Sequence, residues 1–223
     1  MKSLTTLAVC NNMKLCISLI LVAVSCANAH VFLSEPIART SIQLRPEFGA
    51  QQPFWWDNFG VWCNNVQQDT QFSRCGRCGE AQGNRDASQG GIFDKNIIVA
   101  TYTAGSVIPI TARYQAAHYG GFQVELCPQQ TETDNCFQVL PMVSSQQRII
   151  NGNRLCTPYD NRPGGQYDIT VNVRLPANVR CNRCTIRFTH RTFYPWSHEW
   201  VNDSCFTPNP TQTFRNCADV RIV

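Results

Sequence analysis

The fold of this chain is decided most clearly by the stretch Tyr167-Asp168-Ile169-Thr170-Val171-Asn172-Val173-Arg174-Leu175. Apolar or aromatic side chains occupy every second position of this stretch, and polar side chains occupy the positions between them. Successive residues of a β-strand point to opposite faces of the sheet, so a period of two is typical of a strand with one buried face. The stretch therefore predicts a strand that packs one face on a core and exposes the other to water.

Working outward, short β-prone runs separated by turn residues fill most of the chain beyond residue 97, and no run shows a helical stripe of useful length. The first third is rich in Gln, Asn, Gly and Pro, which is typical of long loops. We therefore predict an all-β fold, an antiparallel β-sandwich of immunoglobulin or fibronectin-III type with long disulfide-tied loops. A closed barrel is the alternative. The further expected strands are 97–102, 107–114, 122–126, a run through Ile186 and Phe188, and the chain end with Val220 and Ile222.

The N-terminus has the pattern of a secretory signal peptide. Lys2 and Lys14 precede the apolar run 15–24, which is too short to cross a bilayer as a stable helix. The small-x-small sequence at 27–29 (ANA) fits a signal peptidase, and cleavage after it leaves His30 as the first residue. We expect residues 1–29 to be a signal peptide and 30–223 to be a single secreted domain. A lipoprotein-type cut before Cys26 is a weaker alternative.

Composition supports one disulfide-rich domain. Removal of residues 1–29 from the 223 leaves 194 residues and ten of the 13 cysteines, an even number in a chain expected to be exported. Without the two lysines of the signal, 17 basic residues face 15 acidic ones, a balance that does not suggest a nucleic-acid partner. Lys95 is the only lysine left, so arginine dominates the basic residues. The sequon at Asn202 predicts a glycosylated loop.

A free N-terminal histidine offers two nitrogens to one metal ion, its α-amine and its ring Nδ1, which no internal histidine can do. A second ligand has to come from His118, His190 or His198. His118 has the best setting, since it lies in a glycine-rich loop between two predicted strands. His190 falls on the apolar face of its strand and is compatible with a hydrogen-bonded core residue or a ligand, and His198 with a ligand or a bystander.

Four features together resemble the lytic polysaccharide monooxygenases, and most closely the fifteenth auxiliary-activity family. They are the mature N-terminal His30, the loop 118–122 (HYGGF), the segment 175–184 (LPANVRCNRC) and the terminal stretch 213–220 (TFRNCADV). The resemblance runs across the whole mature chain. It implies a copper enzyme with a histidine brace, in which His30 gives its amine and Nδ1 and His118 gives one ring nitrogen. Three nitrogens in a plane suit copper better than zinc, which prefers a tetrahedral fourth ligand.

The same resemblance assigns the axial side of the copper to Phe214, which cannot coordinate and would shield that side from water. Gln212 falls two residues earlier on the same strand face and would hydrogen-bond an oxygen ligand of the metal. Here the chain departs from the family pattern, which has a glutamate ahead of Thr-Phe. Tyrosine and tryptophan side chains near the copper are candidates for protection against self-oxidation, namely Tyr102, Tyr114, Tyr194 and Trp196.

The activity implied is oxidative cleavage of a β-linked polysaccharide at C1 or C4 by a monomeric enzyme. The co-substrates are an external electron donor and hydrogen peroxide or dioxygen. Chitin is the favoured substrate, cellulose is next, and the arginine-rich surface keeps pectin open. The same residues are also compatible with a different functional class, a non-catalytic secreted β-sandwich that binds polysaccharide or carries copper.

Other readings of the motifs are weaker. No glycine pattern of a nucleophile elbow surrounds a serine, and no pair of glycosidase carboxylates can be identified from spacing. The two CxxC pairs, 75–78 and 181–184, would suit zinc in a reducing compartment, but secretion favours disulfides. The aromatic cluster 54–59 (FWWDNF) is compatible with a sugar-stacking platform or with core packing.

Overall fold

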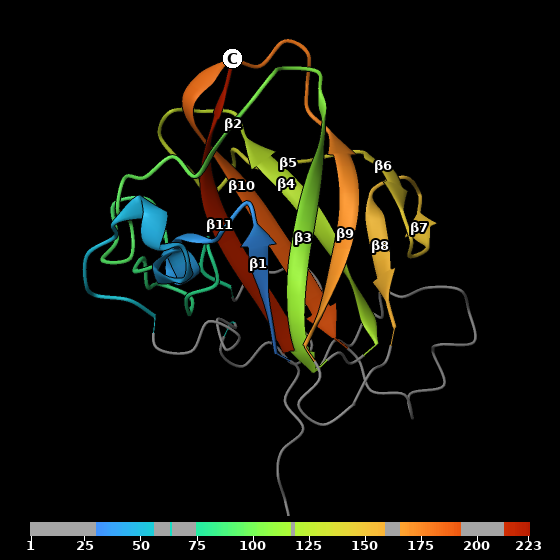
Figure 1. Cartoon of the computed structure of the whole chain (residues 1–223), viewed down its shortest axis with the longest axis horizontal. Coiled ribbons are helices and arrows are strands. Elements are labelled where there is room, and N and C mark those ends of the chain that lie inside the picture. Colours follow the sequence, from blue (N-terminus) through green and yellow to red (C-terminus); the bar gives the residue numbers. More distant parts are fainter. Residues whose placement is uncertain (1–29, 56–62, 64–74, 117–118, 159–165, 193–211) are drawn as a thin grey trace, which may run out of the picture.

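The computed structural model describes residues 30–55, 63, 75–116, 119–158, 166–192 and 212–223. They form two packed β-sheets, so the predicted β-sandwich is confirmed (Figure 1). No helix among these residues is long and apolar enough to cross a membrane.

The smaller sheet has the strand order β1-β3-β9-β6, and every pairing in it is antiparallel. The predicted alternation of 167–175 is confirmed, because Ile169, Val171 and Val173 of β9 are buried while Asp168 and Thr170 are exposed. The strands are β1 (His30–Glu35), β3 (Val107–Ala116), β9 (Tyr167–Arg174) and β6 (Met142–Ser145).

The larger sheet has the order β2-β11-β10-β4-β8-β7, with β5 added to β4. All pairings are antiparallel except β11 with β2, which is parallel. Its strands are β2 (Ala100–Tyr102), β11 (Gln212–Ile222), β10 (Cys181–Thr192), β4 (Gly120–Cys127), β8 (Arg154–Thr157), β7 (Ile149–Ile150) and β5 (Gln138–Val139).

The core lies between the two sheets and is almost wholly apolar. Phe122, Phe188 and Phe214 come from three neighbouring strands of the larger sheet, and Leu33 and Tyr114 face them from the smaller one. Each of these side chains is at most 1% exposed. Removing apolar surface from water is the main favourable term of folding, so this layer holds the two sheets together.

The strand expected at 97–102 begins three residues late, at Ala100. Ile97 and Val99 pack instead against a second apolar cluster formed with Phe32, Ile37 and Ile42. This cluster seats the 3₁₀ helices η1 (Arg39–Leu44) and η2 (Pro46–Phe48), the only helices among the described residues. The early part of the chain is otherwise irregular where it is described, as predicted.

Disulfides rather than zinc account for the cysteines among the described residues. Cys78 bonds to Cys217 of β11, 139 residues away, and so fixes the loop before β2 on the outer face of the larger sheet. The expectation that the cysteines of both CxxC pairs form disulfides is confirmed, although Cys75 and Cys78 bond to other cysteines and not to each other. The other pairs within the described residues are Cys63–Cys75, Cys127–Cys136 and Cys181–Cys184.

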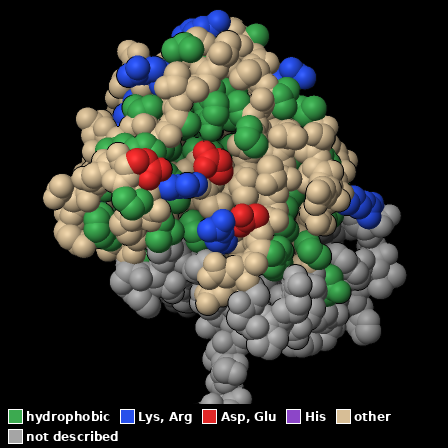
Figure 2. All heavy atoms as spheres, viewed as in Figure 1, with side chains coloured by type: hydrophobic (Ala, Val, Ile, Leu, Met, Phe, Trp, Pro, Cys, Tyr) green, Lys and Arg blue, Asp and Glu red, His purple; other side chains and the backbone are tan. Residues whose placement is uncertain are grey.

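Both faces of β10 are buried, which a simple alternation does not predict. Its core face carries Ile186 and Phe188. On the other face, Thr185 hydrogen-bonds to Glu132, and the guanidinium of Arg187 packs on Phe137. The smaller sheet is different, since its outer face carries exposed charges of both signs next to one another (Figure 2). Arg113 and Asp168 form one such pair, with Nε and Oδ1 2.8 Å apart.

Candidate metal centre

Five strand ends that concern the predicted site meet at one end of the sandwich, drawn at the bottom of Figure 1. β1 begins at His30, and its backbone there pairs with Ala116 at the end of β3. In the larger sheet, Thr192 at the end of β10 pairs with Gly120 at the start of β4 and with Gln212 at the start of β11. The fold therefore gathers the strands that carry or adjoin all four predicted site residues.

A buried hydrogen bond joins the two sheets close to this end. The backbone N–H of Leu33 donates to Oδ1 of Asn216 over 2.8 Å, across 183 residues of sequence. Nδ2 of the same amide donates to the backbone oxygen of Arg215 over 2.7 Å. Asn216 is 0% exposed. It thus ties the strand that begins at His30 to the strand that carries Phe214, a link that the sequence analysis did not identify.

Phe214 lies on the core face of β11 and is 1% exposed. Its backbone pairs with that of His190, and the centroids of the two rings are 6.3 Å apart. The ring therefore belongs to the aromatic cluster at the end of the core where the metal site is predicted.

His190 is a core residue, which confirms one of the two readings left open for it. It is 0% exposed and its Nδ1 lies 3.4 Å from the hydroxyl of Tyr114. The two rings meet edge to face at a centroid distance of 5.3 Å. Burial raises the pKa of Tyr114 well above its ordinary value, with a contribution from Tyr167, so the hydroxyl keeps its proton.

The structure separates two of the tyrosines proposed as protective residues. Tyr114 belongs to the cluster around Phe214 and His190, whereas Tyr102 pairs with Ile222 at the opposite end of β11. Ten residues of strand separate Ile222 from Gln212, a span of about 33 Å. Tyr102 is therefore remote from the predicted centre, and Tyr114 is the better candidate.

Several predicted residues lie outside the described residues. They are His118, His198, Tyr194, Trp196, Asn202 and positions 56–59 of the aromatic cluster. The side chains of His30 and Gln212 also lie outside them, and the structure describes only the backbones of these two residues. Trp55 is described and packs edge to face on Phe93 at 5.2 Å, which supports core packing for that part of the cluster.

No competing metal centre occurs in the described part of the chain. One group brings three potential ligands together, Cys78, Glu132 and Cys217. The two cysteines are joined in a disulfide and offer no thiolate, so this group does not suit a metal ion. The donor set of the predicted brace, two imidazoles and one amine, remains the set that fits a tetragonal copper ion.

A network of charged side chains lies over the outer face of β10 and β11. Asp219 accepts hydrogen bonds from Nε and Nη2 of Arg39 at 2.6 and 2.7 Å, and Glu132 accepts one from Nη2 of the same arginine at 2.8 Å. Burial alone would lower the pKa of Arg39, but the two carboxylates outweigh it and raise the pKa above its ordinary value.

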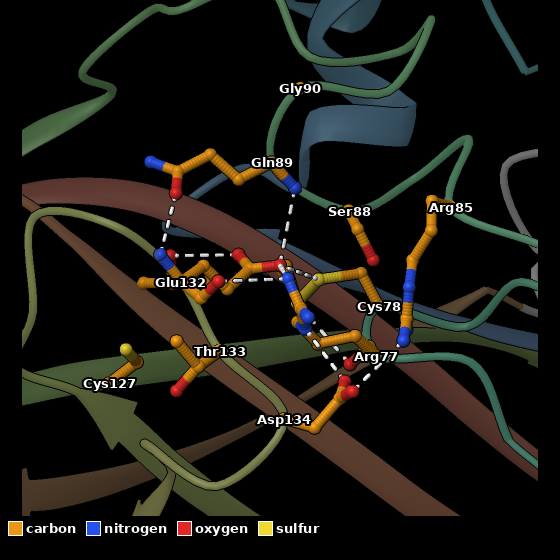
Figure 3. A network of polar contacts seen from close by, with 12 residues as sticks. Arg77, Cys78, Arg85, Ser88, Gln89, Gly90, Cys127, Glu132, Thr133 and Asp134 are labelled. Atoms are coloured by element: carbon orange, nitrogen blue, oxygen red, sulfur yellow. Dashed lines mark hydrogen bonds and ion pairs between the residues drawn. A yellow bond between two sulfur atoms is a disulfide. The ribbon is translucent and has the colours of Figure 1, made fainter.

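Figure 3 shows the neighbouring part of this network, where Glu132 also meets Arg77, with Nη1 and Oε1 3.3 Å apart. Such buried charges are tolerated only when they are paired and hydrogen-bonded. Polar residues inside predicted strands, such as Asn216 and Asp219, were the available signal for these contacts.

Comparison with known proteins gives a consistent result. Residues 30–220 match the family described as lytic polysaccharide mono-oxygenase, cellulose-degrading. The structure is similar to a lytic polysaccharide monooxygenase of family AA15 from Thermobia domestica in the Cu(I) state. The two share 30% sequence identity with a TM-score of 0.66, over 86% of this chain and 98% of that one.

A second similar structure is the cellulose-active lytic polysaccharide monooxygenase CelS2 in complex with copper. It is 17% identical, with a TM-score of 0.50, over 86% of this chain and 98% of that one, and supports the fold alone. No protein with a curated description matches the chain significantly.

Proposed function

Because the chain belongs to the lytic polysaccharide monooxygenase family, and is therefore a copper-dependent oxidoreductase, we propose that it acts as a secreted, monomeric, single-domain enzyme. Its mature form begins at His30 and comprises residues 30–223. The family match itself begins at residue 30. This supports removal of residues 1–29, which would leave a free amine on His30.

The proposed ligands of a single copper ion are His30, through its amine and Nδ1, and His118, through one ring nitrogen. Support comes from the register of β1 and β3, which pairs residue 30 with Ala116. Paired antiparallel residues have Cα atoms about 4.5–5.5 Å apart, and two residues of chain span at most about 7.6 Å. Chain connectivity therefore keeps the two histidines within reach of one ion.

Phe214 and Gln212 complete the proposed centre. When bound, copper supplies one-electron redox chemistry with an external reductant and hydrogen peroxide or dioxygen. Phe214 has no lone pair to give, so it would keep water away from its side of the bound ion. Gln212 lies two residues along β11, and its amide would donate a hydrogen bond toward the reacting oxygen.

For the substrate we place chitin first, on the resemblance to the fifteenth auxiliary-activity family, and cellulose second. The description of the matched family and the activity named for CelS2 support cellulose. Pectin is the third candidate because of the arginine-rich surface. The observation that carries the proposed function is the family match, which covers residues 30–220 and begins at the residue predicted to start the mature chain.

The test begins with N-terminal sequencing of the exported protein, which should start at His30. The copper-loaded protein is then incubated with chitin, cellulose or pectin and ascorbate, and oxidised oligosaccharides are sought by mass spectrometry. His118→Ala should abolish them, and His198→Ala, the matched histidine control, should not. Another N-terminus would contradict the proposed processing. Failure to oxidise any of the three polymers would favour the non-catalytic binder.

A further inference from the structure

A polar pocket of about 510 Å³ lies on the outer face of the larger sheet, on the side away from the core. Four guanidinium groups and two carboxylates line it, those of Arg77, Arg85, Arg187, Arg215, Glu125 and Asp134. Its volume falls in the range of small-molecule sites, about 300–1,000 Å³. None of these residues belongs to the proposed copper centre.

One arginine of this pocket, Arg187, is held in a fixed orientation. Its Nε and Nη2 donate to the two oxygens of Glu125 at 2.7 and 2.8 Å. Its guanidinium carbon lies 3.7 Å from the ring centroid of Phe137. The residue is 9% exposed. Within the described structure, no hydrogen bond uses Nη1, so a rigid guanidinium keeps two N–H groups for a ligand.

The rim of the pocket repeats this arrangement with a shared carboxylate. Asp134 accepts from Nε of Arg77 and from Nη2 of Arg85, each at 2.9 Å (Figure 3). The hydrogen bond from Arg77 and the charges of both arginines hold the pKa of Asp134 below its ordinary value, so it stays ionised. The side chain of Arg85 makes no other hydrogen bond in the described part of the chain and is 50% exposed. Its Nε and Nη1 are thus open to a ligand.

The balance of charge at the pocket favours an anion. Four guanidinium groups and two carboxylates line the pocket, so basic side chains outnumber acidic ones on its described lining. Glu132, behind the lining, is shared by Arg77 with Arg39. Planar guanidinium forks match the two oxygens of a carboxylate better than a spherical ion.

The pocket also lies close to the proposed copper centre. Arg215 directly follows Phe214, and neighbouring residues of a strand face opposite sides, so one faces the pocket and the other the core. Three residues, about 10 Å of strand, separate Arg215 from Gln212 at the start of β11. A polymer bound in the pocket would therefore run beside the end of the sandwich where the copper is proposed.

We propose that this pocket binds a carboxylate-bearing sugar unit of an acidic polysaccharide. The proposal rests on the proposed function only in taking a saccharide as the carrier of the carboxylate. It assigns an affinity for acidic sugar units to this surface, which is distinct from the copper ligands, whichever polymer the copper centre oxidises.

The test is isothermal titration calorimetry of the metal-free mature protein with trigalacturonate, at low and at physiological salt. Neutral chitotriose, inorganic sulfate and inorganic phosphate are the comparison probes. Trigalacturonate should bind more tightly than each of them, and the affinity should fall as salt screens the charges. No binding of trigalacturonate would overturn the proposal, as would equal binding of chitotriose. Equal binding of sulfate or phosphate would assign the pocket to a simple oxyanion instead.

Two pairs of matched variants locate the effect. Arg85→Gln should weaken trigalacturonate binding about tenfold, equivalent to about 1.4 kcal/mol, whereas Arg113→Gln removes the same charge from the other sheet and should leave it unchanged. Asp134→Asn should tighten binding, because it releases both rim arginines, and its control is Asp168→Asn. Equal effects within either pair would show that binding responds to the net charge of the protein and not to this pocket, and would overturn the proposal. Because the metal-free protein is used, failure here is distinct from failure to oxidise a polymer.

Discussion

Replacement of Asn216 by alanine should loosen β1 from β11 at the end of the sandwich where the copper is proposed. The variant removes the acceptor of the 2.8 Å hydrogen bond from the N–H of Leu33 and leaves that donor buried, since Leu33 is 0% exposed. An orphaned buried donor costs about 1–3 kcal/mol. The backbone oxygen of Arg215 also loses the 2.7 Å hydrogen bond that it accepts from Nδ2 of Asn216. We expect a total destabilisation of about 2–4 kcal/mol.

Two measurements separate this local link from a general loss of stability. Chemical denaturation gives the free energy of unfolding, and amide hydrogen exchange followed by mass spectrometry gives the protection of the peptide that contains Leu33. Asn216→Asp keeps an acceptor for that N–H and should retain more protection than Asn216→Ala. Asn172→Ala, which removes an exposed amide bonded to Ser144, should cost less than about 0.5 kcal/mol.

A second control matches the loss of stability without touching the link. Val173→Ala creates a small cavity in the core from β9, on the smaller sheet, and should destabilise by about 1–3 kcal/mol without selective loss at Leu33. In the copper-loaded protein, Asn216→Ala should also change the electron paramagnetic resonance parameters of Cu(II), and Val173→Ala should not. Unchanged protection of the Leu33 peptide in Asn216→Ala would refute the reasoning.

Three further outcomes are expected. His118→Ala should weaken Cu(II) binding, measured by calorimetry, more than about 100-fold, which exceeds the effect of losing an outer partner of a ligand; an affinity equal to that of the unsubstituted protein would remove His118 from the centre. Loss of the Cys78–Cys217 disulfide, by alanine at both positions, should cost about 2–5 kcal/mol and more than loss of Cys127–Cys136, because the sequence separations are 139 and 9; equal costs in denaturation would argue against a constraint on the unfolded chain. Burial, with a smaller effect of Glu35, raises the pKa of Tyr102 from 10.0 to about 12. The folded protein therefore keeps the Tyr102 proton to a higher pH than the unfolded chain does. The stability that this proton contributes is complete below pH 10 and is lost as the pH rises to about 12. Tyr102→Phe should therefore flatten the fall of unfolding free energy between these pH values, and an unchanged slope would contradict this expectation.

The alternation of side chains was enough to predict the sandwich, because a period of two in 167–175 reports burial on one face directly. Ile169, Val171 and Val173 are buried where that pattern places them. The predicted start of β2 was wrong by three residues. Ile97 and Val99 have strand-forming side chains, but they pack on the second apolar cluster, which also seats η1. Intrinsic propensity cannot distinguish these two surroundings.

The polar contacts could not be predicted, because they depend on which loop covers which sheet. Arg187 and Asp219 alternate with core residues as surface residues would, yet Phe137 packs on Arg187 and Arg39 bonds to Asp219, so both are buried. The bond from Leu33 to Asn216 crosses between the sheets and depends on how the two sheets pack. Phe214 was predicted through a family motif, and its burial agrees with its position on the core face of β11.

The proposed copper centre depends most on the free amine of His30, and one comparison of copper affinity tests it directly. The affinity for Cu(II) is measured by calorimetry for the chain beginning at His30 and for the chain that retains Ala27, Asn28 and Ala29 before it. The account predicts a much weaker affinity for the extended chain, because residue 30 then has a peptide nitrogen in place of an amine. Equal affinities would contradict a histidine brace at this position.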